Sequence, residues 1–240
     1  MLYPLSILSV ILLALIHLSH GSKSPHSHAH QKSTASLDAE DTIPFEIRAY
    51  WMRKANEALS ELFTPCPFAA FGTVVVNHTD TSSPLGELVC MSVNQNEQTG
   101  NPTLHGEIAA INNCSAVLAG KGLSPAEIGK AWKDLSLYTN GEPCPMCASA
   151  IRWSGFKECI YGTSIETLFN KGWGQISIST EEVFEESAEL PGRTRLIGNV
   201  LANETDPYFS WQFDGDHPCP KGCGRKSDGF CGVIEGKTEL

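Results

Sequence analysis

The sequence is poor in basic residues: 17 Lys and Arg stand against 27 Asp and Glu, which gives a formal net charge of -10 at pH 7. Because contacts with nucleic-acid phosphates depend on Lys and Arg, this shortage argues against a nucleic acid as the main partner. A small neutral molecule is easier to accommodate. The 240 residues are enough for one domain with a hydrophobic core and shorter appendages.

The sequence also lacks an apolar run that would cross a membrane comfortably, which takes about 20 residues. The run at residues 5–18 is shorter and fits the central region of a secretory signal, with small residues after it. Residues before it include no Lys or Arg, so a signal anchor is the alternative. We expect residues 1–21 to be a signal peptide, residues 22–41 to be a disordered His- and Ser-rich linker, and the protein to be secreted.

Two short motifs have the spacing of a catalytic zinc site. The first holds His105 and Glu107, and the second holds Cys144 and Cys147, which would lie on one face of a helical turn. Neither motif offers the fourth Cys or His that a structural zinc site needs, whereas a catalytic zinc takes three protein ligands and keeps one position for water. We therefore predict that His105, Cys144 and Cys147 bind Zn²⁺.

Two further features of these motifs suit hydrolysis. Pro143 and Pro145 favour the start of a helix, and the positive end of a helix favours cysteine thiolates. Glu107 need only reach the water at the metal, where it would take one proton and pass it to the leaving group. The motifs thus predict a metal-dependent hydrolase with Glu107 as the catalytic acid and base.

The remaining seven of the nine cysteines cannot all pair within one chain, because seven is odd. We expect disulfides in the Cys-rich tail, residues 214–240, among Cys219, Cys223, Cys231 and Cys66, since the chain is predicted to be exported. A second metal site that also uses His217 is the alternative. Cys114 is expected to be a thiol in the core. Export would also make the sequons at Asn77 and Asn203 glycosylation sites.

Hydrophobic periodicity predicts an α/β sandwich with helices on both faces of one sheet. The expected strands are 71–76, 88–93, 135–139 and 158–161, with 196–201 as a final candidate. The expected main helices are 43–63, 105–118 and 145–153, with shorter helical stretches at 124–133 and 181–189. An aromatic cluster at 208–213 is expected either to pack against the core or to close over a substrate ring.

Residues 42–213 resemble the cytidine deaminase-like superfamily, whose zinc deaminases carry His-x-Glu followed by Pro-Cys-x-x-Cys. Tyr50-Trp-Met-Arg and Asn101-Pro-Thr-x-His-x-Glu are similar to tRNA adenosine and guanine deaminases. Leu104-His-Gly-Glu-Ile and Asn113-Cys are similar to cytosine deaminases, and Glu142-Pro-Cys-Pro-Met-Cys to guanine deaminases. The resemblance implies a three-layer α/β/α sandwich around a mixed five-stranded sheet, a zinc ion and a homodimer or larger oligomer.

The resemblance also implies roles for single residues. His105, Cys144 and Cys147 match the zinc ligands, and Glu107 matches the proton shuttle. Two substrate contacts are implied as well, through the side chain of Asn94 and the backbone N–H of Gly106. Guanine deaminases carry an acidic pair after a Gly-aromatic step, one member of which helps to recognise guanine, but here Gly172-Trp173 is followed by Gly174-Gln175.

These observations together predict a zinc-dependent hydrolytic deaminase of a nucleobase or nucleoside. In this reaction a zinc-activated water attacks the ring and ammonia leaves, with a guanine-like purine favoured as substrate. The alternatives are a cytosine or cytidine deaminase, a tRNA adenosine deaminase, and a secreted zinc-binding protein without turnover. The acidic composition argues against tRNA, and the presence of Glu107 argues against loss of turnover.

Overall fold

The computed structural model describes residues 43–79 and 83–234. The predicted signal peptide and the predicted linker lie outside the described residues and stay predictions. Within the described part, no helix combines the length and the apolar character needed to cross a membrane.

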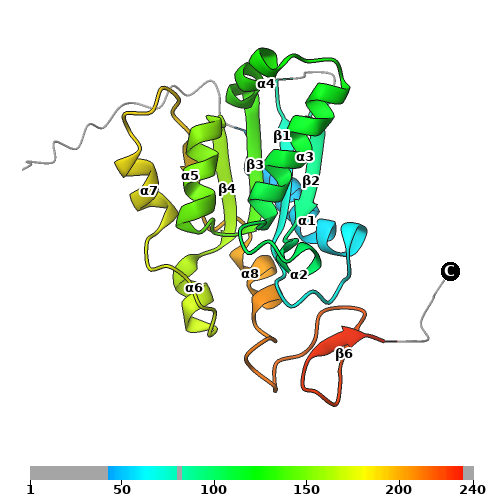
Figure 1. The fold of residues 1–240 in the computed structure, drawn as a ribbon. Coiled ribbons are helices and arrows are strands. Elements are labelled where there is room, and N and C mark those ends of the chain that lie inside the picture. The colour runs from blue at the N-terminus through cyan, green and yellow to red at the C-terminus, as the bar shows by residue number, and fades with distance from the viewer. Residues whose placement is uncertain (1–42, 80–82, 235–240) are drawn as a thin grey trace, which may run out of the picture. The chain divides into compact units, whose positions relative to one another are not determined.

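Five strands form one mixed sheet, as the family resemblance implies, and their order is β2-β1-β3-β4-β5 (Figure 1). The strands are β1 (Gly72–Asn77), β2 (Glu87–Val93), β3 (Leu135–Gly141), β4 (Glu158–Thr163) and β5 (Arg195–Ile197). β1 is antiparallel to both β2 and β3, whereas β4 is parallel to β3 and to β5. The carboxyl ends of β2, β3 and β4 therefore meet at one edge of the sheet, which is where open α/β sheets place their ligands.

Helices cover both faces of this sheet, so the predicted three-layer sandwich is confirmed. The helices are α1 (Phe45–Leu62), α2 (Asn96–Thr99), α3 (Gly106–Gly120), α4 (Pro125–Ala131), α5 (Pro145–Ser154), α6 (Ile165–Asn170), α7 (Thr180–Glu186) and α8 (Ala202–Thr205), with short 3₁₀ turns at Trp132–Asp134 and Asp206–Phe209. In Figure 1, α3 and α5 lie over one face of the sheet and α1 lies behind it.

The alternation of side chains along the strands divides the core between the two faces. One cluster joins strand residues to α3 and α5: Val75, Leu137, Cys159, Ala110, Cys114 and Ile151. The other joins strand residues to α1: Val74, Val76, Tyr138, Ile160, Trp51 and Met52. Both faces of the central strands are thus covered by helices, and the edge with the carboxyl strand ends is left for a site.

Most elements begin or end at slightly different residues from those predicted, and two of these differences are instructive. α3 begins at Gly106, and His105 is the residue before it, in an extended conformation. β5 ends at Ile197, well before residue 201, because Asn199 and Leu201 have positive φ angles of 61° and 55° that cannot continue a strand. Only the first of these differences concerns the metal motif.

The prediction that Cys114 is a free thiol is wrong. Cys114 lies in the core as expected, but it forms a disulfide with Cys90 of β2, with the two Cα atoms 5.3 Å apart. The helical pattern identifies the buried face of α3 but does not show which strand packs against it, so the partner could not be read from the sequence. Cys159 is the cysteine left unpaired outside the metal motif, and it is buried.

The predicted disulfides of the tail are confirmed. Cys66 pairs with Cys223 and Cys219 pairs with Cys231, so none of these thiols is available for a second metal site. The tail adds a small antiparallel pair of strands, β6 (Cys223–Arg225) and β7 (Cys231–Val233). Through Cys66, the tail is bonded to the segment that connects α1 to β1.

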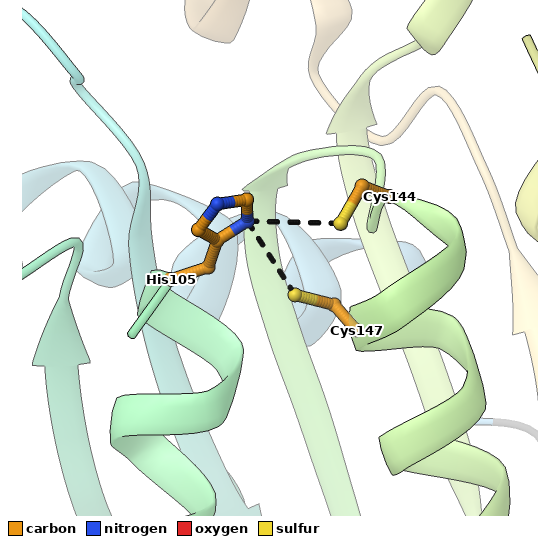
Figure 2. Close-up of side chains that lie close together, drawn as sticks. All are labelled: His105, Cys144 and Cys147. Carbon is orange, nitrogen blue, oxygen red and sulfur yellow. Dashed lines mark hydrogen bonds between the residues drawn. The ribbon is translucent and has the colours of Figure 1, made fainter. Parts of the chain in front are cut away.

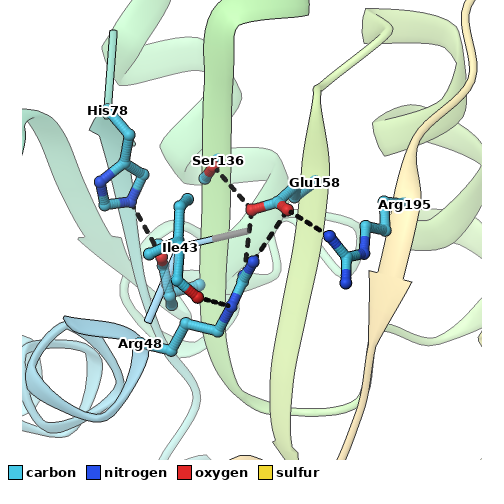
Figure 3. A network of polar contacts seen from close by, with 7 residues as sticks. Ile43, Arg48, His78, Ser136, Glu158 and Arg195 are labelled. Carbon is cyan, nitrogen blue, oxygen red and sulfur yellow. Dashed lines mark hydrogen bonds and ion pairs between the residues drawn. The ribbon is translucent and has the colours of Figure 1, made fainter. Parts of the chain in front are cut away.

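A buried ion pair fixes α1 to the sheet at the start of β4 (Figure 3). The guanidinium of Arg48 donates to both carboxylate oxygens of Glu158, at 3.0 and 2.9 Å, and both side chains are almost fully buried. Ser136 donates a further hydrogen bond to Glu158 at 3.3 Å, and Arg195 lies 3.7 Å from its carboxylate. Because Glu158 opens β4, this network lies at the end of the strand opposite to the carboxyl edge.

Candidate active site

His105, Cys144 and Cys147 come together as the sequence predicts (Figure 2). The Nδ1 atom of His105 lies 3.6 Å from the Sγ of Cys144 and 3.7 Å from the Sγ of Cys147. All three ligand atoms lie within 4.8 Å of one another. A tetrahedral zinc ion with a Zn–S distance of about 2.3 Å and a Zn–N distance of about 2.0–2.1 Å needs an N···S separation of about 3.6 Å. The arrangement therefore fits Zn²⁺ with three protein ligands.

Two helix starts place these ligands. His105 ends the loop after β2 and precedes α3, while Cys144 leaves β3 and precedes α5. Cys147 lies in the first turn of α5, so its sulfur points back towards the same place. Since both helices begin at the ligand cluster, the positive ends of both helix dipoles favour the thiolate ligands there.

The two cysteine thiols have pKa values that are shifted in opposite directions. Hydrogen bonds from Cys147 and from His105 lower the pKa of Cys144 to about 4, against the cost of its burial. The hydrogen bond to Cys144 and burial raise the pKa of the Cys147 thiol. Cys144 is therefore a thiolate at neutral pH, and metal binding has to displace the proton of Cys147.

Glu107 lies beside the ligands in the first turn of α3, and its side chain is only 3% exposed. Burial, with the negative charge of Cys144 as the second cause, raises the pKa of this carboxyl to about 7. A carboxyl group with a pKa near neutrality both accepts and returns protons readily. The geometry thus agrees with the predicted role of Glu107 as a proton shuttle.

A cavity of about 300 Å³ opens over the ligand cluster, and His105, Glu107 and Cys144 form part of its lining. Its volume is at the lower end of the range of about 300–1,000 Å³ for small-molecule sites. Aromatic rings and polar side chains make up much of the remaining wall: Phe68, Phe71, Trp173, Asn94, Glu97 and Gln175. Among the described residues that line the cavity there is no Lys or Arg, whereas three are glutamates.

The two predicted substrate contacts have different positions. Asn94 lines the cavity, and its Oδ1 accepts a hydrogen bond from the backbone N–H of Asn96 at 3.1 Å, which orients the amide. Gly106 is the first residue of α3, where backbone N–H groups have no acceptor within the helix. Gly106 is not among the residues that line the cavity, so its contact with a base stays a prediction.

Glu142 is a buried cavity residue whose role the sequence does not reveal. Its carboxylate accepts hydrogen bonds from the backbone N–H groups of Ile165 at 2.8 Å and Thr180 at 2.9 Å. These partners start α6 and α7 and are far from Glu142 in the sequence. Glu142 therefore fixes the cysteine motif to the segments that follow β4.

Two further cavity residues that the sequence did not reveal lie in the segments between the main elements. Phe68 lies between α1 and β1, and Glu97 lies in the short helix α2, where no periodic pattern marks a buried face. The aromatic cluster at 208–213 packs against the core rather than over the cavity: Phe209 and Trp211 are buried and neither lines it. Phe209 instead accepts a hydrogen bond at its carbonyl from the indole N–H of Trp173, at 2.9 Å.

Comparison with known families agrees with this geometry. Residues 46–163 match the cytidine and deoxycytidylate deaminase zinc-binding region. That stretch contains the three ligands, Glu107 and Asn94. The family description names zinc, and the His-Cys-Cys group has the geometry to hold it.

Known relatives include deaminases with different substrates. The chain is 33% identical over 145 residues to guanine deaminase of Bacillus subtilis, a match that covers 59% of this chain and 79% of the relative. It is 33% identical over 93 residues to tRNA-specific adenosine deaminase of Rickettsia bellii, covering 39% of this chain and 54% of the relative. Cytosine deaminase of Candida albicans is 32% identical over 100 residues, a match that covers 42% of this chain and 56% of the relative. The chain thus spans only about half the length of the latter two relatives.

A solved structure supports the fold. The crystal structure of a mutant of the protein NE0047 in complex with 8-azaguanine superposes with a TM-score of 0.53 at 17% identity. The superposition covers 67% of this chain and 81% of that chain. At this identity the likeness concerns the fold alone.

Proposed function

Because this chain belongs to the cytidine and deoxycytidylate deaminase family, we propose that it hydrolyses the exocyclic amino group of a nucleobase or nucleoside, with a guanine-like purine as the favoured substrate. The observation that supports turnover is the buried Glu107 next to a three-ligand zinc site in an accessible cavity. In the reaction, the oxygen of water bonds to the amine-bearing ring carbon, the C–N bond breaks and ammonia leaves.

Different residues would bind the metal, transfer the proton and orient the ring. His105, Cys144 and Cys147 would hold Zn²⁺, and the bound metal would lower the pKa of a water molecule to about 7. Glu107 would take a proton from the attacking water and return it to the departing nitrogen. The Asn94 amide hydrogen-bonds the ring and orients it. The rings of Phe71 and Trp173, which pack edge to face with centroids 5.5 Å apart, form an apolar part of the cavity wall against which the planar base would lie.

The charge of the cavity supports an uncharged substrate. Glu97 and Glu142 line it together with Glu107, and a phosphate group would meet these carboxylates without a basic partner among the described lining residues. We therefore expect bases and nucleosides to be deaminated faster than nucleotides or tRNA. The small volume of the cavity supports the same order.

Cytosine is the second candidate substrate. The acidic pair that would recognise guanine is replaced by Gly174-Gln175, and Gln175 lines the cavity. A glutamine offers both a donor and an acceptor, so it does not require the donor-rich edge of guanine. The similarity to the Candida albicans enzyme favours the same alternative.

The test measures ammonia release by zinc-loaded protein with guanine, adenosine, cytosine and cytidine. Glu107→Gln should lower the rate by about 10²–10⁴-fold, because it removes the proton carrier, while zinc remains at one ion per chain. Glu186→Gln, an exposed change on α7, is the matched control. A zinc-loaded wild type that is inert on all four compounds, or a Glu107→Gln variant as active as the wild type, contradicts the proposal.

We also propose that the protein is exported, N-glycosylated and dimeric. Disulfides at Cys90–Cys114 and in the tail favour an oxidising compartment. Asn203 is exposed on α8, and Asn77 ends β1 in a partly exposed position. Trp153 on α5 is 76% exposed, which offers apolar surface to a second copy.

Expression in secreting cells tests these points together. Protein in the medium should shift in mass with a glycosidase, lose the shift in Asn77→Gln/Asn203→Gln, and sediment as a dimer. Retention inside the cell, an unshifted mass or a monomer at micromolar concentration contradicts the corresponding point.

A further inference from the structure

We propose that the disulfide-bonded tail positions Phe68 and thereby sets which ring systems the cavity accepts. This inference rests on the proposed function, because it takes the cavity to be the one that receives the base. The described part of the tail is residues 214–234, and Phe68 belongs to the segment that joins α1 to β1.

The first link between the tail and the cavity wall is covalent. Cys66, two residues before Phe68, is bonded to Cys223 at the start of β6, with their Cα atoms 6.0 Å apart. Both cysteines are buried. A displacement of the tail is therefore carried directly to the backbone beside a cavity residue.

The second link is aromatic. The Phe68 ring lies 5.6 Å from the ring of Trp173, which also lines the cavity, and 5.7 Å from the ring of Phe230, in the turn between β6 and β7. Phe213 and Trp211 approach the same ring at 5.7 and 6.1 Å. Phe68 is thus in ring contact both with a residue of the cavity wall and with rings of the C-terminal segment.

The third link passes through the backbone. The side-chain amide of Gln212 donates to the carbonyl of Phe68 at 2.9 Å and to the carbonyl of Tyr208 at 2.8 Å. The tail that follows is fixed in turn by one guanidinium: Arg225 donates to carbonyls of the surrounding loops, those of Trp211, Asp214, His217 and Gly229. The segment that contacts Phe68 is therefore itself held in place by hydrogen bonds.

The consequence for substrates follows from the position of the metal. The reacting carbon must lie at His105, Cys144 and Cys147, so the rest of the base extends along the aromatic wall. A bicyclic base extends further than a monocyclic one and depends more on the position of Phe68. A loosened tail should therefore weaken the binding of a purine more than that of a pyrimidine, and it should leave the chemical step at Glu107 unchanged.

The experiment compares two tail variants with a matched surface variant. Cys66→Ser/Cys223→Ser breaks the covalent link, and Phe230→Ala removes a ring that is 48% exposed. Phe45→Ala removes a ring that is 58% exposed at the first position of α1, at the other end of that helix from Cys66. KM and kcat are measured for the best purine and the best pyrimidine, and zinc is counted per chain.

Both tail variants should raise KM for the purine about fivefold with kcat within about twofold, as expected for a loss of binding without a loss of chemistry. KM for the pyrimidine should change less, and Phe45→Ala should resemble the wild type. Equal KM values for wild type and both tail variants overturn the inference and leave the proposed function intact. If the double variant does not fold, Phe230→Ala decides the outcome.

Hydrogen exchange of backbone amides gives a readout that does not need turnover. Exchange in residues 68–71 and 172–175 should be faster in both tail variants than in the wild type and in Phe45→Ala. Faster exchange in a protein that deaminates no base supports the coupling and counts against the proposed function. Unchanged exchange in the tail variants overturns the coupling.

Discussion

Thr180 is hydrogen-bonded to Glu142 and to Pro143 at the start of the cysteine motif. The backbone N–H of Thr180 donates to the carboxylate of Glu142 at 2.9 Å, and the hydroxyl of Thr180 donates to the carbonyl of Pro143 at 2.8 Å. Pro143 precedes Cys144, so these two hydrogen bonds fix the segment that carries Cys144 and Cys147.

Glu142→Ala should therefore weaken metal binding without touching a ligand. Loss of an outer partner of a metal site lowers metal affinity by about 10–100-fold. Two buried N–H groups, those of Ile165 and Thr180, also lose their acceptor, which costs about 1–3 kcal/mol each. Competition with a zinc indicator dye measures the affinity, with Glu186→Ala as the control. An affinity equal to that of the wild type contradicts the positioning role.

The ion pair between Arg48 and Glu158 should contribute far more to the free energy of unfolding than an exposed pair of the same geometry. Glu158→Ala leaves a buried guanidinium without its partner and should lower the free energy of unfolding by about 3–5 kcal/mol. Arg53 and Glu204 form a similar two-pronged pair in the open, so Glu204→Ala should cost no more than about 1 kcal/mol. Urea unfolding measures both, and equal costs would show that burial does not matter here.

Removal of zinc should lower thermal stability, because the three ligands come from two segments that the metal joins. A ligand that binds only the folded chain stabilises it by about 4 kcal/mol at a thousandfold excess over its Kd. The melting temperature should thus drop on treatment with a chelator and recover when zinc is restored. His105→Ala should melt at the same temperature with and without chelator, and a chelator-sensitive His105→Ala would point to a different metal site.

His78 should make the fold sensitive to acid. Burial lowers the pKa of His78 to about 4, while the unfolded value is about 6.5, so the unfolded chain binds more protons between these values. The contribution of His78 to stability is therefore complete above pH 6.5 and is lost as the pH falls towards 4. Its ring nitrogen lies 2.9 Å from the hydroxyl of Tyr138, close to Glu158 and Arg48 (Figure 3).

The measurement compares the unfolding free energy of wild type and His78→Gln between pH 4 and pH 7. Carboxylates titrate in both proteins, so the difference between the two curves isolates the imidazole. The wild type should lose more stability than the variant on acidification. Parallel curves contradict the role of His78.

Gly106→Ala should lower activity in a protein that still folds. A Cβ at this position would lie 3.0 Å from the carbonyl oxygen of Phe71 and 3.1 Å from the hydroxyl of Thr73, so these neighbours or the start of α3 must give by a few tenths of an ångström. His105 and Glu107 flank this position, and since a displacement of about 1 Å in a catalytic group costs about 10²-fold in rate, this smaller shift should cost less than that. Gly120→Ala, where a Cβ meets nothing within 4 Å, is the control. Equal rates for the two variants contradict the steric argument.

The metal centre could be predicted because its chemistry requires certain residue types at short spacing. Cys144 and Cys147 occupy one turn of one helix, and His105 and Glu107 are two residues apart, so each motif is complete within a local segment. The strands of the sheet were predictable for a similar reason, because a run of buried β-branched residues such as that of β1 indicates a strand within its own few residues.

The wall of the cavity could not be predicted, because it depends on contacts between distant segments. Phe68 and Trp173 are more than a hundred residues apart and meet only after the sheet has formed. Glu142 belongs to the recognised cysteine motif, but the sequence does not show that Ile165 and Thr180 are its hydrogen-bond partners. The pairing of Cys90 with Cys114 belongs to the same class, since it requires the packing of α3 on β2.

The arrangement of bridges in the tail has a consequence for proteolysis. Cys219 is joined to Cys231, while Cys223 between them is joined to Cys66 in the main domain. A protease that cuts once between Cys223 and Cys231 would leave both fragments attached to each other. Such a nicked chain would run at full size on a denaturing gel and release its C-terminal fragment only when the sample is boiled with a thiol.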